Sequence, residues 1–205
     1  MKDMTITYEV DGALYVNITN RCSNRCDFCI RNNGDGAYGS NSLWLAREPS
    51  CDEIFDSIVK SNPDNYSELV FCGYGEPTER LDDLLEVAKR VKENYSVKIR
   101  INTNGHSSLI HGCDTAPKYS GVIDTVSISL NAPDAKGYNK VCHSVFGETA
   151  FEGLLEFASR VKNYVKTVVL TVVDIALTEE EIEECQKIAN SVGVPLRVRK
   201  YIGKE

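Results

Sequence analysis

The sequence predicts an α/β fold, a partial (β/α)6 TIM-type barrel preceded by an N-terminal β-hairpin. Six strand-like segments alternate with helix-like segments along the 205 residues, which is the order that a parallel sheet with right-handed crossovers requires. Three of these strands end in turns that contain Gly, Asn or Pro. A closed eight-fold barrel takes about 250 residues, so six units predict an open barrel. A flat, doubly wound sheet is the alternative.

The predicted hairpin begins the chain. Residues 4–10 and 13–19 alternate apolar and polar side chains around Asp11-Gly12, a dipeptide that favours the positive φ angles of a tight turn. The second strand leads directly into a loop with three cysteines, so we expect that loop at the carboxyl end of the strand. Residues 32–41 are rich in Gly and Asn and predict a flexible loop beside it.

A strand-and-helix pattern fills the rest of the chain. Ser50 is predicted to be a helix N-cap, and Glu53 completes a capping box for a helix that ends near Ser61. Hydrophobic periodicity predicts later strands at 69–72, 97–103, 122–130, 167–174 and 196–202, and later helices at 81–94, 148–163 and 178–192. Residues 106–121 are the weakest unit because their helical pattern is poor. Since neither a repeat nor a linker is found, we expect residues 1–205 to form one domain.

Composition argues against nucleic acid and membrane partners. The net charge is −7, from 23 basic and 30 acidic residues, whereas nucleic-acid binding rests on clustered Lys and Arg. Arg197, Arg199 and Lys200 gather on the last predicted strand, which is typical of a solvated face or a small-anion site. No apolar run of about 18 residues could span a bilayer, and the N-terminus lacks a secretory signal. We therefore expect a cytoplasmic protein whose cysteines are reduced.

The main chemical signal is the motif Cys22-x3-Cys26-x2-Cys29. Thiolates are soft ligands, and three this close on a loop can converge on one metal centre but cannot pair off into disulfides. A structural zinc site takes four ligands, usually as two separated pairs, and no second pair follows. Three thiolates on a four-iron cluster would leave one iron open to a ligand from outside the protein, which is a catalytic arrangement. A non-catalytic iron–sulfur or zinc-binding module is the alternative.

Polar side chains follow several predicted strands. Gly73-Tyr74-Gly75-Glu76-Pro77 comes after the strand at 69–72, and Asn104 and Asn131 come after the next two strands. Each segment alone is ordinary turn chemistry. Because the carboxyl ends of parallel strands meet at one edge, we expect all of them near the cysteine loop.

Together these residues resemble the radical S-adenosylmethionine (SAM) superfamily over nearly the whole chain. The cysteine motif has the aromatic Phe28 before its last cysteine, as that family prefers. Gly75-Glu76-Pro77 is similar to the family's Gly-Gly-Glu motif, with Tyr74 in place of its first glycine. Ser129-Leu130-Asn131 falls where the family binds ribose. Residues 26–34 and 127–134 look most like the short radical SAM proteins associated with TatD-type nucleases, for which no substrate is established.

The resemblance implies an enzyme with a [4Fe-4S] cluster on Cys22, Cys26 and Cys29 and with SAM as the ligand of the open iron. A one-electron donor such as flavodoxin or ferredoxin would reduce it, and reductive cleavage of SAM would give a 5′-deoxyadenosyl radical that abstracts hydrogen from an unidentified substrate. The implied SAM-binding residues are Glu76 for the amino group, Gly73, Tyr74 and Gly75 for the methionine backbone contacts, Asn104, Ser129 and Asn131 for the carboxylate or ribose, Phe28 and Val173 for adenine, and Arg199 for the carboxylate.

Other interpretations stay open within the same family. A short activase or a deazaguanine-synthase-like enzyme is the alternative, although the latter carry a hydroxyl residue for magnesium just after the last cysteine, and residues 30–32 offer none. The loop at 32–45 gives the barrel mouth little cover, so a macromolecular substrate or a partner protein is possible. Tyr38 and Trp44 would line that mouth or pack the loop. Five other cysteines are predicted to be buried as small hydrophobic residues: Cys51, Cys72, Cys113, Cys142 and Cys185. The three histidines are predicted to be ordinary loop residues, although His111 lies near enough to Cys113 for a weak metal interpretation.

Overall fold

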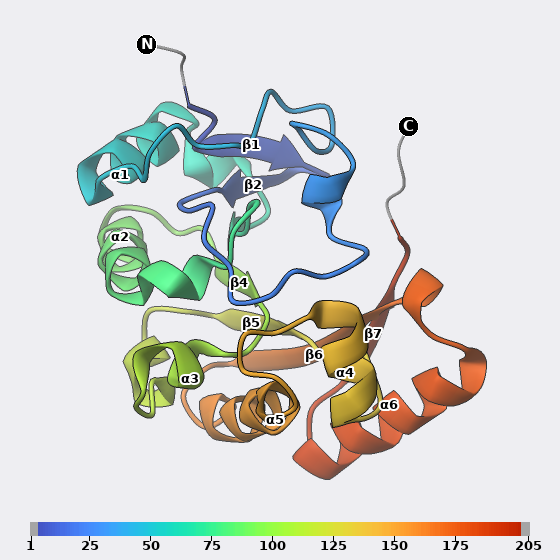
Figure 1. The fold of residues 1–205 in the computed structure, drawn as a ribbon. Coiled ribbons are helices and arrows are strands. Elements are labelled where there is room, and N and C mark those ends of the chain that lie inside the picture. The colour runs from blue at the N-terminus through green and yellow to red at the C-terminus, as the bar shows by residue number, and fades with distance from the viewer. Residues whose placement is uncertain (1–3, 202–205) are drawn as a thin grey trace.

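The computed structural model describes residues 4–201, and within them seven strands form one sheet in the sequential order β1 to β7. The strands are β1 Thr7–Val10, β2 Ala13–Val16, β3 Leu69–Phe71, β4 Ile99–Thr103, β5 Thr125–Ser129, β6 Thr167–Val173 and β7 Leu196–Arg199. The β1–β2 pair is antiparallel and the other five pairs are parallel. The two edge strands do not pair with each other over this range. This confirms a partial barrel that follows an N-terminal hairpin (Figure 1).

Helices cover the outer face of the curved sheet (Figure 1). They are α1 Cys51–Lys60, α2 Leu81–Asn94, α3 Ser107–His111, α4 Ala135–Cys142, α5 Thr149–Val161 and α6 Glu179–Val192. Short 3-10 turns lie at Ile30–Asn32, Pro63–Asn65, Pro77–Arg80, Ala116–Tyr119 and Asp174–Ala176. The capping box predicted for α1 is present, because Ser50 accepts from the backbone of Glu53 and Glu53 accepts in return. The sequence missed α3 and α4.

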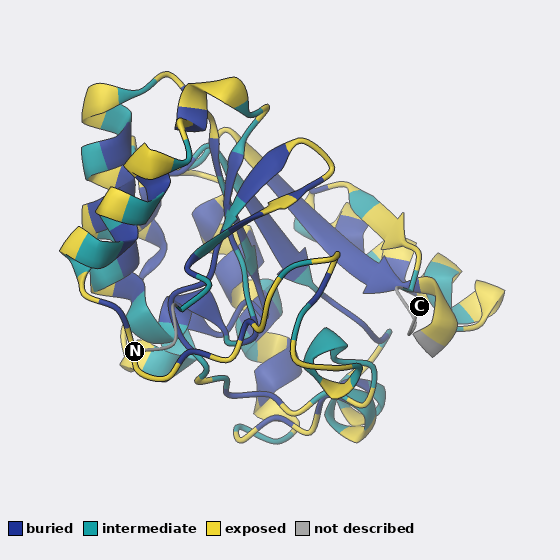
Figure 2. Ribbon diagram, turned by 90° about the horizontal axis from the view of Figure 1, so that it is seen from above, coloured by how far each residue is buried: buried dark blue, intermediate teal, exposed yellow. Residues whose placement is uncertain are grey.

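The core lies between the sheet and these helices. Side chains alternate along a strand, so Phe71, Ile101 and Ile128 point outward into this core and are fully buried. Figure 2 shows the same division, with dark blue strands and yellow outer helix surfaces. The neighbouring positions on each strand face the barrel interior and are largely polar, which is where the candidate site is found.

The loop after the cysteine motif packs over the hairpin end of this interior. Ala37 and Leu43 are buried against Tyr8, Val10 and Tyr74 in a second, smaller apolar cluster. The loop that the Gly and Asn content predicts to be flexible is therefore anchored at two points to the inner face.

Two predictions reach beyond the described residues. The last strand was predicted to end at 202, which lies outside them, and β7 ends at Arg199. The N-terminal residues 1–3, which entered the argument about a secretory signal, also lie outside. Among the described residues, none of the helices has the length and apolar character needed to cross a membrane.

Candidate functional site

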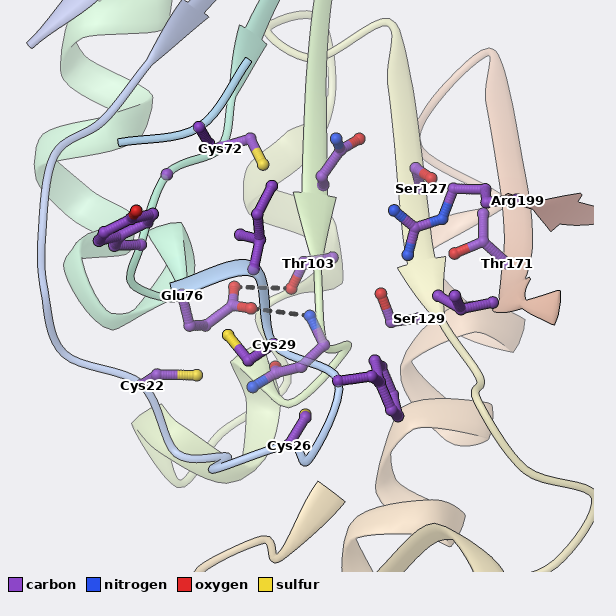
Figure 3. A pocket seen from close by; sticks show the side chains of 18 of the residues that line it. Cys22, Cys26, Cys29, Cys72, Glu76, Thr103, Ser127, Ser129, Thr171 and Arg199 are labelled. Atoms are coloured by element: carbon purple, nitrogen blue, oxygen red, sulfur yellow. Dashed lines mark hydrogen bonds between the residues drawn. The ribbon is translucent and has the colours of Figure 1, made fainter. Parts of the chain in front are cut away.

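One cavity of about 440 Å³ occupies the barrel interior and opens at the carboxyl ends of the strands. Every residue that the sequence predicts for the site lines it: Cys22, Cys26, Phe28, Cys29, Gly73, Tyr74, Gly75, Glu76, Asn104, Ser129, Asn131, Val173 and Arg199. They come from loops and strand ends spread over almost the whole chain. Figure 3 shows the three cysteines on one wall and Arg199 on the opposite side.

The cysteine loop is held by backbone hydrogen bonds to the end of α4. Arg25 N donates to the Cys142 carbonyl at 2.9 Å, and Asp27 N donates to the Val141 carbonyl at 3.0 Å. Just beyond α4, Val145 N donates to the carbonyl of Ser23 at 2.9 Å. The motif is thus held by a helix more than 100 residues away in the chain, in addition to local hydrogen bonds such as that from Cys29 N to the Cys26 carbonyl at 3.2 Å.

A buried polar network supports the same loop from below. Asn104 Nδ2 donates to Ser23 Oγ at 2.9 Å, and Asn24 Nδ2 donates to the Tyr138 hydroxyl at 2.9 Å. The ring of His106 connects the two contacts, with Nδ1 at 3.5 Å from Ser23 Oγ and Nε2 at 3.3 Å from the Tyr138 hydroxyl. Burial lowers the pKa of His106 to about 4 and so keeps the imidazole neutral at physiological pH. The sequence predicts an ordinary loop histidine, whereas His106 is fully buried and has a structural role in this network.

The three thiols have the chemistry of a soft-metal site. Burial raises the pKa of Cys22 to about 12 and also raises that of Cys29, while a hydrogen bond with the Cys142 thiol raises that of Cys26. Each thiol is therefore protonated until a metal displaces the proton. In the described part of the chain, no three acidic, His or Cys side chains are grouped tightly enough to hold a single metal ion. A cluster needs no such grouping, because its protein ligands sit on different irons.

Glu76 is the one carboxylate among the described residues that line the cavity, and it accepts four hydrogen bonds. Its Oε1 accepts from Thr78 N at 3.0 Å, from Thr78 Oγ1 at 2.7 Å and from Thr103 Oγ1 at 2.7 Å. Its Oε2 accepts from Asn104 N at 2.7 Å, which leaves this oxygen able to accept from a further donor (Figure 3). Burial raises the pKa of Glu76, and the four donors oppose that shift. The residue joins the turns that follow β3 and β4.

The glycines beside Glu76 are required by chain packing. A Cβ on Gly75 would lie 2.4 Å from the Thr19 carbonyl oxygen and 2.5 Å from that of Arg21. A Cβ on Gly73 would lie 2.1 Å from Asn17 Oδ1. The sequence explained both glycines by the approach of a ligand to the backbone. The structure adds another reason, because the turn presses against the segment that joins β2 to the cysteine loop.

Replacing Gly75 by Ala is therefore expected to destabilise the protein by about 1–3 kcal/mol, since the new methyl group meets backbone that cannot move cheaply. Urea unfolding monitored by circular dichroism measures the change. The matched control is Gly137→Ala in α4, where the Cβ has an ordinary contact of 3.4 Å and the substitution improves helix propensity. Equal stability of the two variants would show that the turn is not tightly packed.

The end of β5 contributes an unsatisfied acceptor. Asn131 is 3% exposed and adopts a left-handed backbone conformation, with φ of 56°. Its Nδ2 lies 3.8 Å from Cys142 Sγ, and its Oδ1 has no hydrogen-bond partner among the described residues. A buried acceptor that lines a cavity fits a ligand with hydroxyl or amino donors. Ser129, Phe28 and Val173 line the same region, so a polar ligand with an aromatic group matches this wall.

Several predicted residues take positions that the sequence left open. Tyr38 lines the cavity, whereas Trp44 packs edge-on against Tyr74, with ring centroids 5.0 Å apart. The prediction that the remaining cysteines are buried is confirmed for Cys142 and Cys185 and wrong for Cys113, which is exposed. Cys51 and Cys72 are only half-buried, and Cys72 lines the cavity. His111 Nε2 donates to the Thr78 carbonyl at 2.9 Å, so this ring is used in holding the β3 turn.

Sequence analysis missed the deeper lining residues: Tyr8, Tyr15, Arg100, Asn102, Ser127 and Thr171. A signal was present for the last three of these. Asn102 lies two positions before Asn104, Ser127 two before Ser129, and Thr171 two before Val173. Residues two apart on a strand share a face, so the inward positions could have been extended down the strands.

Comparisons with known proteins give matches over most of the chain. The family model described as "Radical SAM superfamily" matches residues 16–189. A tRNA-2-methylthio-N(6)-dimethylallyladenosine synthase of Finegoldia magna is 23% identical over 203 residues, which cover 94% of this chain and 41% of that protein. The chain therefore spans about two fifths of the length of this curated relative.

Solved structures share the fold. Streptococcus suis SuiB bound to its precursor peptide SuiA has a TM-score of 0.68 and 18% identity, over 93% of this chain and 39% of that one. A radical SAM methyltransferase from Sphaerobacter thermophilus has a TM-score of 0.66 and 14% identity, over 95% and 68% of the two chains. SuiB bound to S-adenosylmethionine has a TM-score of 0.62 and 21% identity, over 92% and 38%.

Proposed function

The chain belongs to the radical SAM superfamily, a family of enzymes that use a [4Fe-4S] cluster and SAM, and from this premise we propose that it is a single catalytic domain that cleaves SAM reductively. When bound, the cluster supplies one electron that breaks a carbon–sulfur bond of SAM and so starts radical chemistry on a substrate. The observation that carries the proposal is the convergence of the three cysteines, the Gly-Glu-Pro turn and the ends of β4 and β5 on one cavity.

The chain's own groups would bind and orient the cofactors. Cys22, Cys26 and Cys29 would hold three irons of the cluster, and the α4 contacts of their loop fix the spacing beforehand. Glu76 Oε2 would accept from the SAM amino group, because this oxygen keeps a free lone pair. Asn131 Oδ1 would accept from a ribose hydroxyl, which supplies the missing partner of a buried atom.

Other wall residues would set the orientation of SAM. Phe28 and Val173 offer apolar surface for adenine, and Ser129 offers a hydroxyl on the ribose side. Asn104 uses both ends of its amide within the protein, since Oδ1 accepts from His106 N at 3.0 Å and Nδ2 donates to Ser23. Its remaining amide hydrogen is available to SAM. Arg199, which the sequence implies for the SAM carboxylate, lies beside Ser127 and Thr171 in Figure 3.

The test is anaerobic reconstitution with iron and sulfide, followed by reduction in the presence of SAM. We expect a brown protein with about four irons and four sulfides per chain that forms 5′-deoxyadenosine and methionine in equal amounts. A protein that carries the full cluster and leaves SAM intact would contradict the proposal. Zinc without sulfide in the purified protein would favour the non-catalytic module instead.

The electron donor and the wider substrate are further parts of the proposal. A small reducing protein such as flavodoxin or ferredoxin would supply the electron. One structural relative, SuiB, has a precursor peptide bound, which supports a macromolecular substrate or partner as one candidate for this chain. The deazaguanine-synthase-like alternative is disfavoured, because the 3-10 turn Ile30–Asn32 directly after Cys29 has no hydroxyl side chain. Kinship with the TatD-associated proteins stays a prediction from the sequence.

A further inference from the structure

The charge of the cavity is opposite to that of the protein. The chain has a net charge of −7, but the cavity is lined by four basic side chains, Arg100, Arg197, Arg199 and Lys200, and by one carboxylate, Glu76. That carboxylate already accepts four hydrogen bonds at the cysteine side of the cavity. A concave, partly buried surface with basic lining focuses a positive potential, which attracts anions.

The cavity also has two levels. The residues proposed for SAM lie at the strand ends, such as Asn104 after β4. The lining continues down the same strand to Asn102 and Arg100, and four residues of strand span roughly 13 Å. On the neighbouring strand Ser127 pairs in register with Asn102. Cys72, Asn102 and Ser127 therefore form a polar lower level that the proposed SAM contacts do not use.

Two atoms of this lower level have no hydrogen-bond partner within residues 4–201. They are Arg100 Nε, a donor, and Asn102 Oδ1, an acceptor. The other end of Arg100 is occupied, because Nη2 lies 2.9 Å from Glu68 Oε1 and 3.4 Å from the Tyr15 hydroxyl. Buried polar atoms are normally paired. A ligand that both accepts and donates would satisfy this donor and this acceptor, which lie two residues apart on one face of β4.

Arg199 completes the lower level from the opposite side. Its side chain extends past Thr171 and Ser127 into the cavity in Figure 3, on the side opposite Glu76 and the three cysteines. Among the described carboxylates, none forms an ion pair with Arg199, Arg197 or Lys200. A guanidinium presents a planar fork of donors that matches a carboxylate or a phosphate. The neighbouring Ser127 hydroxyl adds a further donor for the same oxyanion, whereas the Thr171 hydroxyl already donates to the Ile128 carbonyl at 3.4 Å.

We propose that the lower level of the cavity is the substrate subsite and that it takes a small organic anion. The anionic group, a carboxylate or a phosphate, binds the guanidinium of Arg199 and the hydroxyl of Ser127. A hydroxyl or amino group of the same molecule donates a hydrogen bond to Asn102 Oδ1. An acceptor atom of that molecule accepts a hydrogen bond from Arg100 Nε. The naming of this ligand as substrate rests on the proposed function, whereas its binding does not.

The test uses four small probes on the reconstituted protein with SAM present: glycerate, glycerol 3-phosphate, glycerol and propionate. Saturation-transfer NMR titrations measure each dissociation constant. We expect glycerate or glycerol 3-phosphate to bind at least tenfold more tightly than neutral glycerol. Tighter binding of glycerate would indicate a carboxylate ligand, and tighter binding of glycerol 3-phosphate would indicate a phosphate. Arg199→Gln is expected to raise the dissociation constant of the tighter anion about tenfold, which is the effect of losing one charge-assisted hydrogen bond.

Two further variants make the test specific. Arg160→Gln removes the same charge from the outer surface of α5, where Arg160 pairs with Glu156 and Asp114, and anion binding should not change. Asn102→Ala should lower the affinity for glycerate several-fold and leave the affinity for propionate unchanged, because propionate has no hydroxyl to donate to Asn102 Oδ1. This difference separates a direct contact from a general disturbance of the cavity.

The outcomes distinguish the subsite from the proposed function. Anions that bind no more tightly than glycerol would overturn the subsite, even if SAM is cleaved. Arg199→Gln that weakens SAM binding but not the anionic probe would overturn it too, and would assign Arg199 to the SAM carboxylate. Anion binding that depends on Arg199, in a protein that never cleaves SAM, would support the subsite and contradict only the proposed function.

Discussion

Cys26→Ala is expected to remove both the brown colour of the reconstituted protein and all detectable SAM cleavage. The residue is the central ligand of the motif and lines the same wall as Cys22 and Cys29. Two thiols cannot hold a four-iron cluster that the family binds with three, so the loss should be complete and not partial. Iron and sulfide analysis, the visible absorption spectrum and the yield of 5′-deoxyadenosine measure it.

The control is Cys113→Ala. This cysteine is exposed and does not line the cavity, so the variant should keep its iron, its colour and its SAM cleavage. A Cys26→Ala protein that still carries about four irons would show that the cluster sits elsewhere. Circular dichroism of both variants shows whether the fold is intact, which we expect because backbone hydrogen bonds to the end of α4 hold the cysteine loop in either variant.

Glu76→Gln is expected to keep the cluster but to raise the dissociation constant for SAM by about tenfold or more. The substitution removes the negative charge that we propose for binding the SAM amino group, and a hydrogen bond to a charged partner contributes about 1.5–3 kcal/mol. Equilibrium binding of SAM to the reconstituted protein measures the effect. Unchanged affinity would remove Glu76 from the binding site.

A second effect of the same substitution is on stability. Oε1 accepts three hydrogen bonds and Oε2 accepts one from Asn104 N. A glutamine keeps its carbonyl oxygen at the Oε1 position and then turns its amide group toward Asn104 N, which places two donors face to face. We expect a loss of about 1–3 kcal/mol in the free energy of unfolding. Glu79→Gln, three residues further on and outside the cavity, is the matched control and should change neither property.

Local sequence signals predicted much of the fold because they act over a few residues. The Asp11-Gly12 turn, the capping box of α1 and the apolar stripe of α2 each depend on neighbours within one or two turns, and all three are present. The carboxyl-end rule then placed the cysteine loop, the Glu76 turn and Asn131 together, and they line one cavity. The order of the parallel strands therefore predicts which distant residues meet, whereas hydrophobic periodicity alone predicts only the individual strands and helices.

Other features depend on contacts that the sequence does not display. The helix α4 has eight residues and a glycine at its third position, which is a weak helical signal. It is stabilised by the complete burial of Tyr138 and Cys142 against the cysteine loop and the His106 region. The lower level of the cavity was not predicted for another reason. A single polar residue within a strand, such as Asn102 or Ser127, does not by itself indicate whether it faces the barrel interior or the helices.

The attachment of the cysteine loop to α4 has a consequence for biogenesis. The ligands Cys22, Cys26 and Cys29 leave the ribosome early, but the backbone groups that fix their loop belong to residues 141, 142 and 145. Until those residues have been made, the thiols lie on an unsupported segment, open to oxidation and to the wrong metal. We therefore expect stable cluster binding only after residues 141–145 have been made, and a fragment that ends before α4 would carry all three cysteines without the contacts that hold their loop.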